Sequence, residues 1–128
     1  MAKLIVLEKA HLLLKDVNVA AKGIRQSHLT ALKKQLFKTA LSIPSNISEG
    51  RKKTSQREFH RFLDIALASS GELETQLRAA KDCNAIPDDV QADLAKRTEE
   101  VGKMLSGLMR RIIEDLGDSP DSADSPDP

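Results

Sequence analysis

The chain has 128 residues, of which 40% are hydrophobic and 30% charged, and this composition fits one globular domain. Its 20 lysine and arginine residues nearly balance 19 aspartate and glutamate residues, so the formal net charge of +1 does not by itself indicate a nucleic-acid or membrane partner. All three aromatic residues are Phe, which argues against modules that stack several bases on exposed rings.

The cysteine content and the apolar segments indicate the cellular compartment of the protein. A single cysteine, Cys83, excludes an internal disulfide framework. Glu8 and Lys9 interrupt the apolar N-terminal run and no small-residue cleavage site follows, so we predict no signal peptide. No segment reaches the roughly 18–20 apolar residues that span a bilayer. We therefore expect a cytoplasmic protein without a membrane partner.

The first half of the chain predicts two helices. Apolar residues at steps of three and four indicate a helix over residues 4–22, which ends at Gly23. A second helix is predicted to begin near Ser27, a favourable N-cap. Pro44 falls inside its apolar stripe and lacks the N–H that a helix needs, so we predict a kink there and an end at Gly50.

The second half predicts two longer helices of about thirty residues, each about 45 Å long at 1.5 Å per residue. Ser55 and Glu58 form a capping-box pattern at the start of the third helix, which is expected to end near Asn84. The fourth helix is expected to begin at Pro87 or Asp88. It is expected to end at Gly117, and Arg97 interrupts its apolar stripe.

Four amphipathic helices with short links predict an all-α fold, an antiparallel up-and-down four-helix bundle over residues 1–116. Several large apolar residues fall beside the expected core stripes. A wide core-facing stripe would accommodate them, but burial against a second copy of the chain is the interpretation we favour. These residues are Leu12, Val19, Phe37, Leu41, Phe62, Ile65, Leu67 and Ile113.

The charge is distributed unevenly along the chain. Residues 117–128 hold four Asp and three Pro and no large apolar residue, so we predict a disordered acidic tail there. The segment 22–61 instead contains ten basic and two acidic residues. This excess predicts a surface that binds the backbone of RNA or DNA, although a solvated face with local ion pairs is the alternative. The candidate binding residues are Lys33, Lys34, Lys38, Arg51, Lys52, Lys53, Arg57 and Arg61.

The middle of the chain resembles a family of bacterial four-helix-bundle proteins, some of which are encoded within intervening sequences of large-subunit ribosomal RNA genes. The resemblance spans about residues 4–115 and is strongest over residues 40–77. Its elements are Lys9-Ala10-His11, Ser42-Ile43-Pro44-Ser45-Asn46-Ile47, Glu49-Gly50, Ser55, Glu58-Phe59, Phe62-Leu63, Ile65-Ala66, Ser69 and Glu72-Leu73-Glu74-Thr75-Gln76-Leu77. The chain departs from the family at Leu7, Phe37-Lys38 and Arg51-Lys52, which changes the surface rather than the fold.

The resemblance implies a bundle with a kinked second helix and a ring-shaped homo-oligomer, typically a pentamer. It also implies a relation to the accessory proteins of diversity-generating retroelements, which are basic barrels that bind nucleic acid and a reverse transcriptase. The wider family has no established enzymatic activity. The motif residues are interpreted as structural rather than as a catalytic pocket, because buried polar groups are normally partnered. They are Pro44, Asn46, Glu49, Gly50, Ser55, Glu58, Glu72, Glu74 and Gln76.

Enzymatic alternatives have weak support in the residues. A di-iron bundle needs two Glu-x-x-His motifs, and only Glu8 to His11 provides one, so we expect no metal and no cofactor. Cys83 lies near a helix C-terminus, which disfavours a thiolate, and is expected to be a small buried group. The sequence therefore predicts a non-enzymatic homo-oligomer that binds nucleic acid, with a protein–protein scaffold as the alternative.

Overall fold

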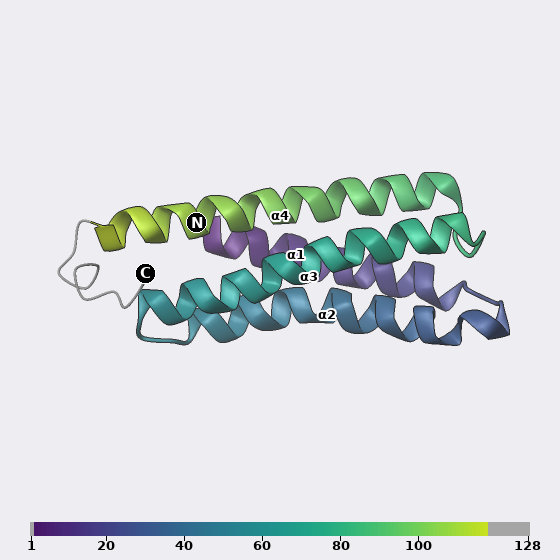
Figure 1. The fold of residues 1–128 in the computed structure, drawn as a ribbon, viewed down its shortest axis with the longest axis horizontal. Helices are drawn as coiled ribbons and strands as arrows, with labels where there is room; N and C mark the ends of the chain where they lie inside the picture. The colour runs from purple at the N-terminus through teal and green to yellow at the C-terminus, as the bar shows by residue number, and fades with distance from the viewer. Residues whose placement is uncertain (1, 118–128) are drawn as a thin grey trace.

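The computed structural model describes residues 2–117, with side chains from Ile5 onward. It contains four long helices, α1 (Ala2–Lys22), α2 (Thr30–Arg51), α3 (Gln56–Asp82) and α4 (Asp88–Gly117), and the described residues form no strand. The helices run side by side in alternating directions (Figure 1). The predicted all-α four-helix bundle is therefore confirmed. The predicted tail lies outside the described residues from position 118 onward.

One apolar stripe from each helix forms the core. Leu13, Ile43, Leu63, Leu73 and Leu105 are among its fully buried side chains. Each helix packs against its neighbours in the chain, and α4 also packs against α1. The α1–α4 contact is strengthened by Arg97 Nη1, which donates a 2.8 Å hydrogen bond to Asp16 Oδ2. The charge that interrupts the predicted stripe of α4 thus links two helices that are distant in sequence.

The start of α2 differs from the prediction. Ser27 does not cap the helix but begins a short 3₁₀ turn, Ser27–Leu29, and α2 starts at Thr30 with no side-chain cap. The Thr30 hydroxyl donates to the carbonyl of Ser27 at 2.9 Å. A 3₁₀ turn is a common start for an α-helix, because its tighter hydrogen bonds pair N–H groups that have no partner within the first turn of the helix.

α2 continues through Pro44 without interruption and ends at Arg51. The prediction that the helix survives the proline is confirmed, while the kink itself stays a prediction. Pro44 is buried, and the nearby Asn46 side chain donates a 2.8 Å hydrogen bond to the carbonyl of Ser42. The Asn46 side chain thus supplies a hydrogen-bond donor to a backbone carbonyl close to Pro44, which has no N–H of its own.

The links on both sides of α3 follow known capping geometries. At its start, the N–H of Glu58 donates to Ser55 Oγ at 3.2 Å, which confirms the predicted N-cap. At its end, Asn84 has a left-handed φ of 59°. The N–H of Ala85 bonds to the carbonyl of Ala80 at 2.8 Å, which together with Asn84 makes a Schellman motif. The chain therefore reverses direction within a few residues at each end.

Candidate nucleic-acid interface

The eight predicted binding residues come from α2, the α2–α3 link and the start of α3. Lys33, Lys34 and Lys38 lie in the first half of α2, and Arg51 ends that helix. Lys52 and Lys53 belong to the link between α2 and α3, whereas Arg57 and Arg61 lie one turn apart on α3. The link and the first turns of α3 bring Arg51, Lys52, Lys53, Arg57 and Arg61 to one end of the bundle.

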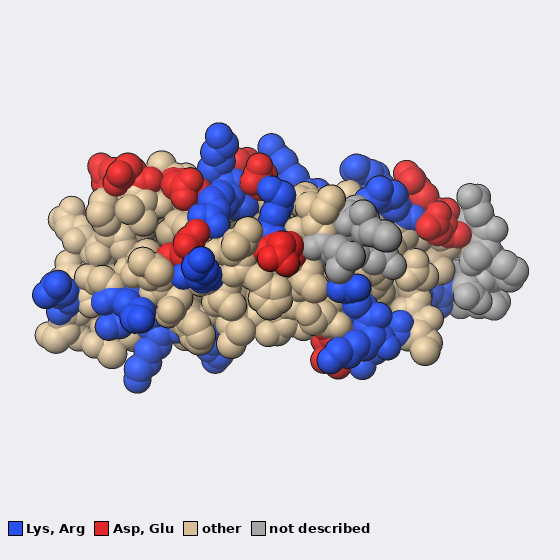
Figure 2. Space-filling view, turned by 180° about the vertical axis from the view of Figure 1, so that it is seen from behind, with Lys and Arg blue, Asp and Glu red and all other residues tan. Residues whose placement is uncertain are grey.

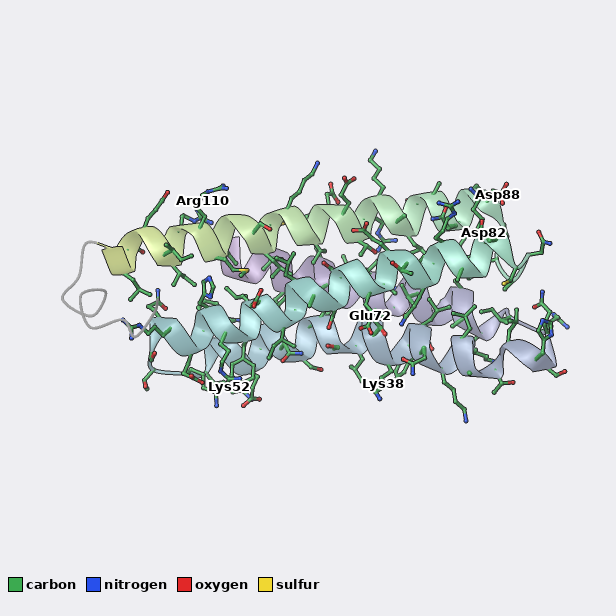
Figure 3. All side chains as sticks on the ribbon, viewed as in Figure 1. Lys38, Lys52, Glu72, Asp82, Asp88 and Arg110 are labelled. Carbon is green, nitrogen blue, oxygen red and sulfur yellow. The ribbon has the colours of Figure 1, made fainter. Side chains whose placement is uncertain are left out.

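The positive residues form two groups rather than one patch. Lys38 and Lys52 lie apart along the outer edge of α2 (Figure 3). Figure 2 shows lysine and arginine side chains gathered near the end where α2 meets α3, separated by uncharged surface from those nearer the other end. We call Lys33, Lys34 and Lys38 the helix group. We call Arg51, Lys52, Lys53, Arg57 and Arg61 the turn group.

Two members of the turn group are held by neighbouring side chains. Lys53 Nζ lies 3.6 Å from Glu49 Oε2, and Arg61 Nη2 lies 3.0 Å from Glu58 Oε1. Both cations also cover the half-buried Phe62 ring, at 5.3 Å for Lys53 and 4.7 Å for Arg61. Lys53 and Arg61 therefore stabilise the turn and are less available to an outside phosphate.

The electrostatic effect of this arrangement appears at Glu58. The hydrogen bond from Arg61 holds the pKa of Glu58 below its ordinary value, against partial burial and with help from the charges of Arg61 and Lys53. The same hydrogen bond raises the pKa of Arg61. Glu58 therefore stays ionised and neutralises part of the positive charge of the turn group.

Other members of both groups remain accessible. Lys34, Lys38, Arg51 and Lys52 are exposed. Within residues 2–117 none of them has an ion-pair partner. Lys33 and Arg57 are half-buried, and Arg57 has an interaction of its own. The side chains most suited to neutralise phosphates are therefore at the two ends of the exposed face of α2.

Several polar residues of the family motif have structural contacts on α2 and α3. Ser42 Oγ and Ser69 Oγ lie 2.6 Å apart and join the two helices. Asn46 Nδ2 bonds to Ser42, Glu49 pairs with Lys53, and Ser55 caps α3. Glu72 and Glu74 are exposed and Gln76 is half-buried. These contacts favour the structural interpretation of the motif.

Gly50 explains a further part of the motif. A Cβ atom at this position would lie 2.8 Å from Phe59 Cδ1 and 2.9 Å from Phe62 Cβ. Both distances are shorter than non-bonded carbon atoms tolerate. Only a residue without a side chain therefore lets the last turn of α2 approach α3 this closely.

Sequence reasoning missed or misjudged several features. Ile5 is 48% exposed and lies on the same face of α1 as Leu12 and Val19, which were predicted to lie outside the core. The three residues are spaced seven apart in the sequence, and this spacing could have indicated their common face. His60 Nε2 and Gln76 Oε1 are buried without a hydrogen-bond partner among the described residues, and no sequence pattern indicates either. Cys83 is exposed, so its prediction as a buried group is wrong, because the turn after α3 leaves it outside the core.

Residues 2–117 contain neither a cluster of metal-binding side chains nor a helix that could span a membrane. No three His, Cys, Asp or Glu side chains in this range are grouped so that they could hold a metal ion. None of the helices there combines the length and apolar character needed to cross a bilayer. The absence of a cofactor stays a prediction.

The sequence matches a family model over residues 2–107, that of the 23S rRNA-intervening sequence protein. The chain belongs to this family. Membership in the 23S rRNA-intervening sequence protein family confirms that part of the predicted resemblance, whereas the relation to retroelement accessory proteins stays a prediction. No curated protein matches the sequence.

A solved structure shares the fold of this family member. It is described as a protein with unknown function from the S23 ribosomal protein family of Bacteroides thetaiotaomicron VPI-5482. It is 22% identical to this chain, and the alignment covers 86% of this chain and 99% of that one with a TM-score of 0.79. At this identity the likeness concerns the fold alone.

Proposed function

We propose that this member of the 23S rRNA-intervening sequence protein family is a non-enzymatic, cytoplasmic homo-oligomer that binds the backbone of RNA or DNA. The observation that carries the proposal is the exposed cations on α2 and its end. Lys34, Lys38, Arg51 and Lys52 are exposed and lack ion-pair partners within residues 2–117. Accessible cations displace counterions from phosphates, which is the main source of non-specific affinity for nucleic acid.

The proposed assembly is a ring of five copies, by analogy with the family that the sequence resembles. A ring repeats the cations of α2 once per subunit, so contacts that are weak in one subunit add along one nucleic acid. Such a ring would act as an accessory to an enzyme of nucleic-acid chemistry, such as a reverse transcriptase. Of the three Phe residues only Phe37, beside Lys38, is exposed, and one ring does not form a stacking platform. Binding is therefore directed to phosphates and has little sequence preference.

The proposal is tested by fluorescence anisotropy of labelled RNA and DNA over a series of salt concentrations. We expect log affinity to fall linearly with log salt. In the variant Arg51→Gln/Lys52→Gln the slope on double-stranded DNA should decrease by up to about 1.8, since each lost phosphate contact contributes about 0.9. Lys96→Gln/Lys103→Gln, which removes two exposed cations from α4, is the matched control. No binding at low salt would overturn the proposal.

The exposed apolar side chains favour a second candidate function, a protein–protein scaffold. Ile5, Leu12 and Val19 are 48%, 46% and 63% exposed and share one face of α1. Apolar surface of this kind commonly marks a protein contact. In a nuclease-treated lysate, a scaffold would retain one stoichiometric protein partner other than itself. Retention of nucleic acid and of no other protein would favour the first candidate.

A further inference from the structure

We propose that the nucleic acid bound by this protein is double-stranded and that α2 lies across one of its grooves. This inference rests on the proposed function and adds the substrate class. In this arrangement the helix group contacts one phosphate backbone, and the turn group contacts the backbone on the other side of the groove. The middle of the exposed face of α2 then lies over the groove itself.

The pattern of side chains on α2 is the first argument. Positions 34, 38, 41, 45, 48 and 52 follow steps of four and three, so they share one face of the helix. Lysines occupy the two ends of this row and uncharged residues occupy its middle. We call this row the α2 stripe, and its members are Lys34, Lys38, Leu41, Ser45, Ser48 and Lys52.

Burial and ion pairing support the same arrangement. Lys34, Lys38, Leu41, Ser45 and Lys52 are exposed, and Ser48 is half-buried. In this arrangement Leu41 faces the groove rather than a second copy of the chain. The one carboxylate within α2, that of Glu49, is paired with Lys53 at 3.6 Å. The stripe is therefore positive at both ends and has a neutral middle that a polyanion can approach.

The distance between the positive ends is the second argument. Lys38 and Lys52 are separated by four turns of α2, or about 21 Å at 1.5 Å per residue. Figure 3 shows these two residues apart along the outer edge of the helix. The phosphates of one strand follow each other at about 3.4 Å along a duplex axis, far closer than the two ends. The B-DNA major groove is about 12 Å wide. The phosphate groups at its two edges and the flexible lysine side chains add to this width, so that two lysines about 21 Å apart along α2 can reach phosphates on both sides of the groove.

A single strand fits the same surface poorly. A strand that followed α2 would place phosphates over Leu41, Ser45 and Ser48, the part of the α2 stripe that carries no cation. A duplex presents base-pair edges at that place, and the serine hydroxyls can bond to them or to the sugar. In RNA the corresponding surface is the wide, shallow minor groove.

The test compares single strands and duplexes with the full-length protein. Labelled 20-nucleotide strands without self-complementarity are measured by anisotropy alone and annealed, as DNA and as RNA. Lys34→Gln/Lys38→Gln removes one end of the stripe and Lys52→Gln removes the other. Lys96→Gln/Lys103→Gln on α4 is the matched control for the double variant. Far-ultraviolet circular dichroism checks that each variant retains its helices.

We expect at least one kind of duplex, DNA or RNA, to bind at least tenfold more tightly than its single strand near 100 mM salt. Each end variant should reduce duplex affinity several-fold while changing single-strand affinity less, and the control should change neither. Equal affinity for single strands and duplexes would overturn this inference and leave the proposed function intact. So would equal losses in the end variants and the control. Absence of binding to every probe at low salt would overturn both.

Discussion

At the scale of single residues, Gly50 determines how closely the end of α2 approaches α3. The nearest atoms to a Cβ at this position are in Phe59 and Phe62, and the Cβ of Phe62 cannot move without moving the backbone of α3. A methyl group here would force the two helices apart or displace both rings. The glycine of the Glu-Gly pair is therefore explained by packing, without reference to a ligand.

Gly50→Ala should lower the free energy of unfolding, measured by urea denaturation. The control is Gly71→Ala on α3, where a Cβ has no neighbour within 4 Å. Both substitutions gain helix propensity of up to about 1 kcal/mol. The difference between the two variants, expected at about 1–3 kcal/mol, therefore measures the steric cost at Gly50. Equal stability of the two variants would show that the close approach is not required.

Residue-scale predictions from sequence succeeded where a local pattern determines the contact. The Ser55 cap depends only on residues three positions apart, and it was predictable for that reason. The coverage of Phe62 by Lys53 and Arg61 depends on how the α2–α3 link turns, which no local pattern specifies. Cys83 was misjudged because its exposure depends on where α3 ends.

At the scale of helices, the contact between α1 and α4 contains a charged link. Arg97 pairs with Asp16 on α1 at 2.8 Å and with Asp93 on its own helix at 3.4 Å. Burial lowers the pKa of Arg97, but the hydrogen bonds and charges of Asp16 and Asp93 outweigh this effect and raise it. The Arg97 side chain is 28% exposed, so solvent weakens both pairs.

A double-mutant cycle with Asp16→Asn and Arg97→Gln should give a coupling energy of up to about 1 kcal/mol. The cycle with Asp93→Asn and Arg97→Gln is the comparison, and about 0.3–0.5 kcal/mol is expected for such a pair within one helix. Urea denaturation of the single and double variants provides both values. A coupling energy near zero for Asp16 and Arg97 would mean that apolar packing alone joins α1 to α4.

The helices themselves were largely predictable, because steps of three and four identify the buried side of each one. Their ends were less predictable. The 3₁₀ turn before Thr30 replaced the expected cap at Ser27, since both geometries satisfy the same backbone groups. The sequence also suggested one basic surface, whereas the length of α2 separates the helix group from the turn group.

At the scale of the whole molecule, the exposed apolar side chains are the candidate contacts between copies in the proposed assembly. Six of the eight residues that were expected outside the core are exposed, and Phe62 and Leu67 are half-buried. The two of them on α1, Leu12 and Val19, form a row with the exposed Ile5 at steps of seven residues. Their periodicity in sequence showed that they lie beside the core, but the lateral arrangement of copies cannot be derived from one chain.

Leu12→Glu/Val19→Glu should reduce the molar mass in solution, measured by light scattering after size-exclusion chromatography. Two carboxylates on this face would have to be buried in an interface, which is unfavourable without partners. Lys96→Glu on α4 changes the net charge by the same amount and should leave the mass unchanged. A monomeric unsubstituted protein, or an unchanged mass in the α1 variant, would contradict the role of this face in assembly.

The up-and-down order of the helices also has a consequence for how the chain folds. α1 packs on α2, α2 on α3 and α3 on α4, through links of only a few residues. Most native contacts therefore join segments that are close in sequence, and only the α1–α4 contact closes a long loop. Domains with such local topology fold within microseconds to milliseconds. During synthesis, the first two helices can pair before the last two have been made.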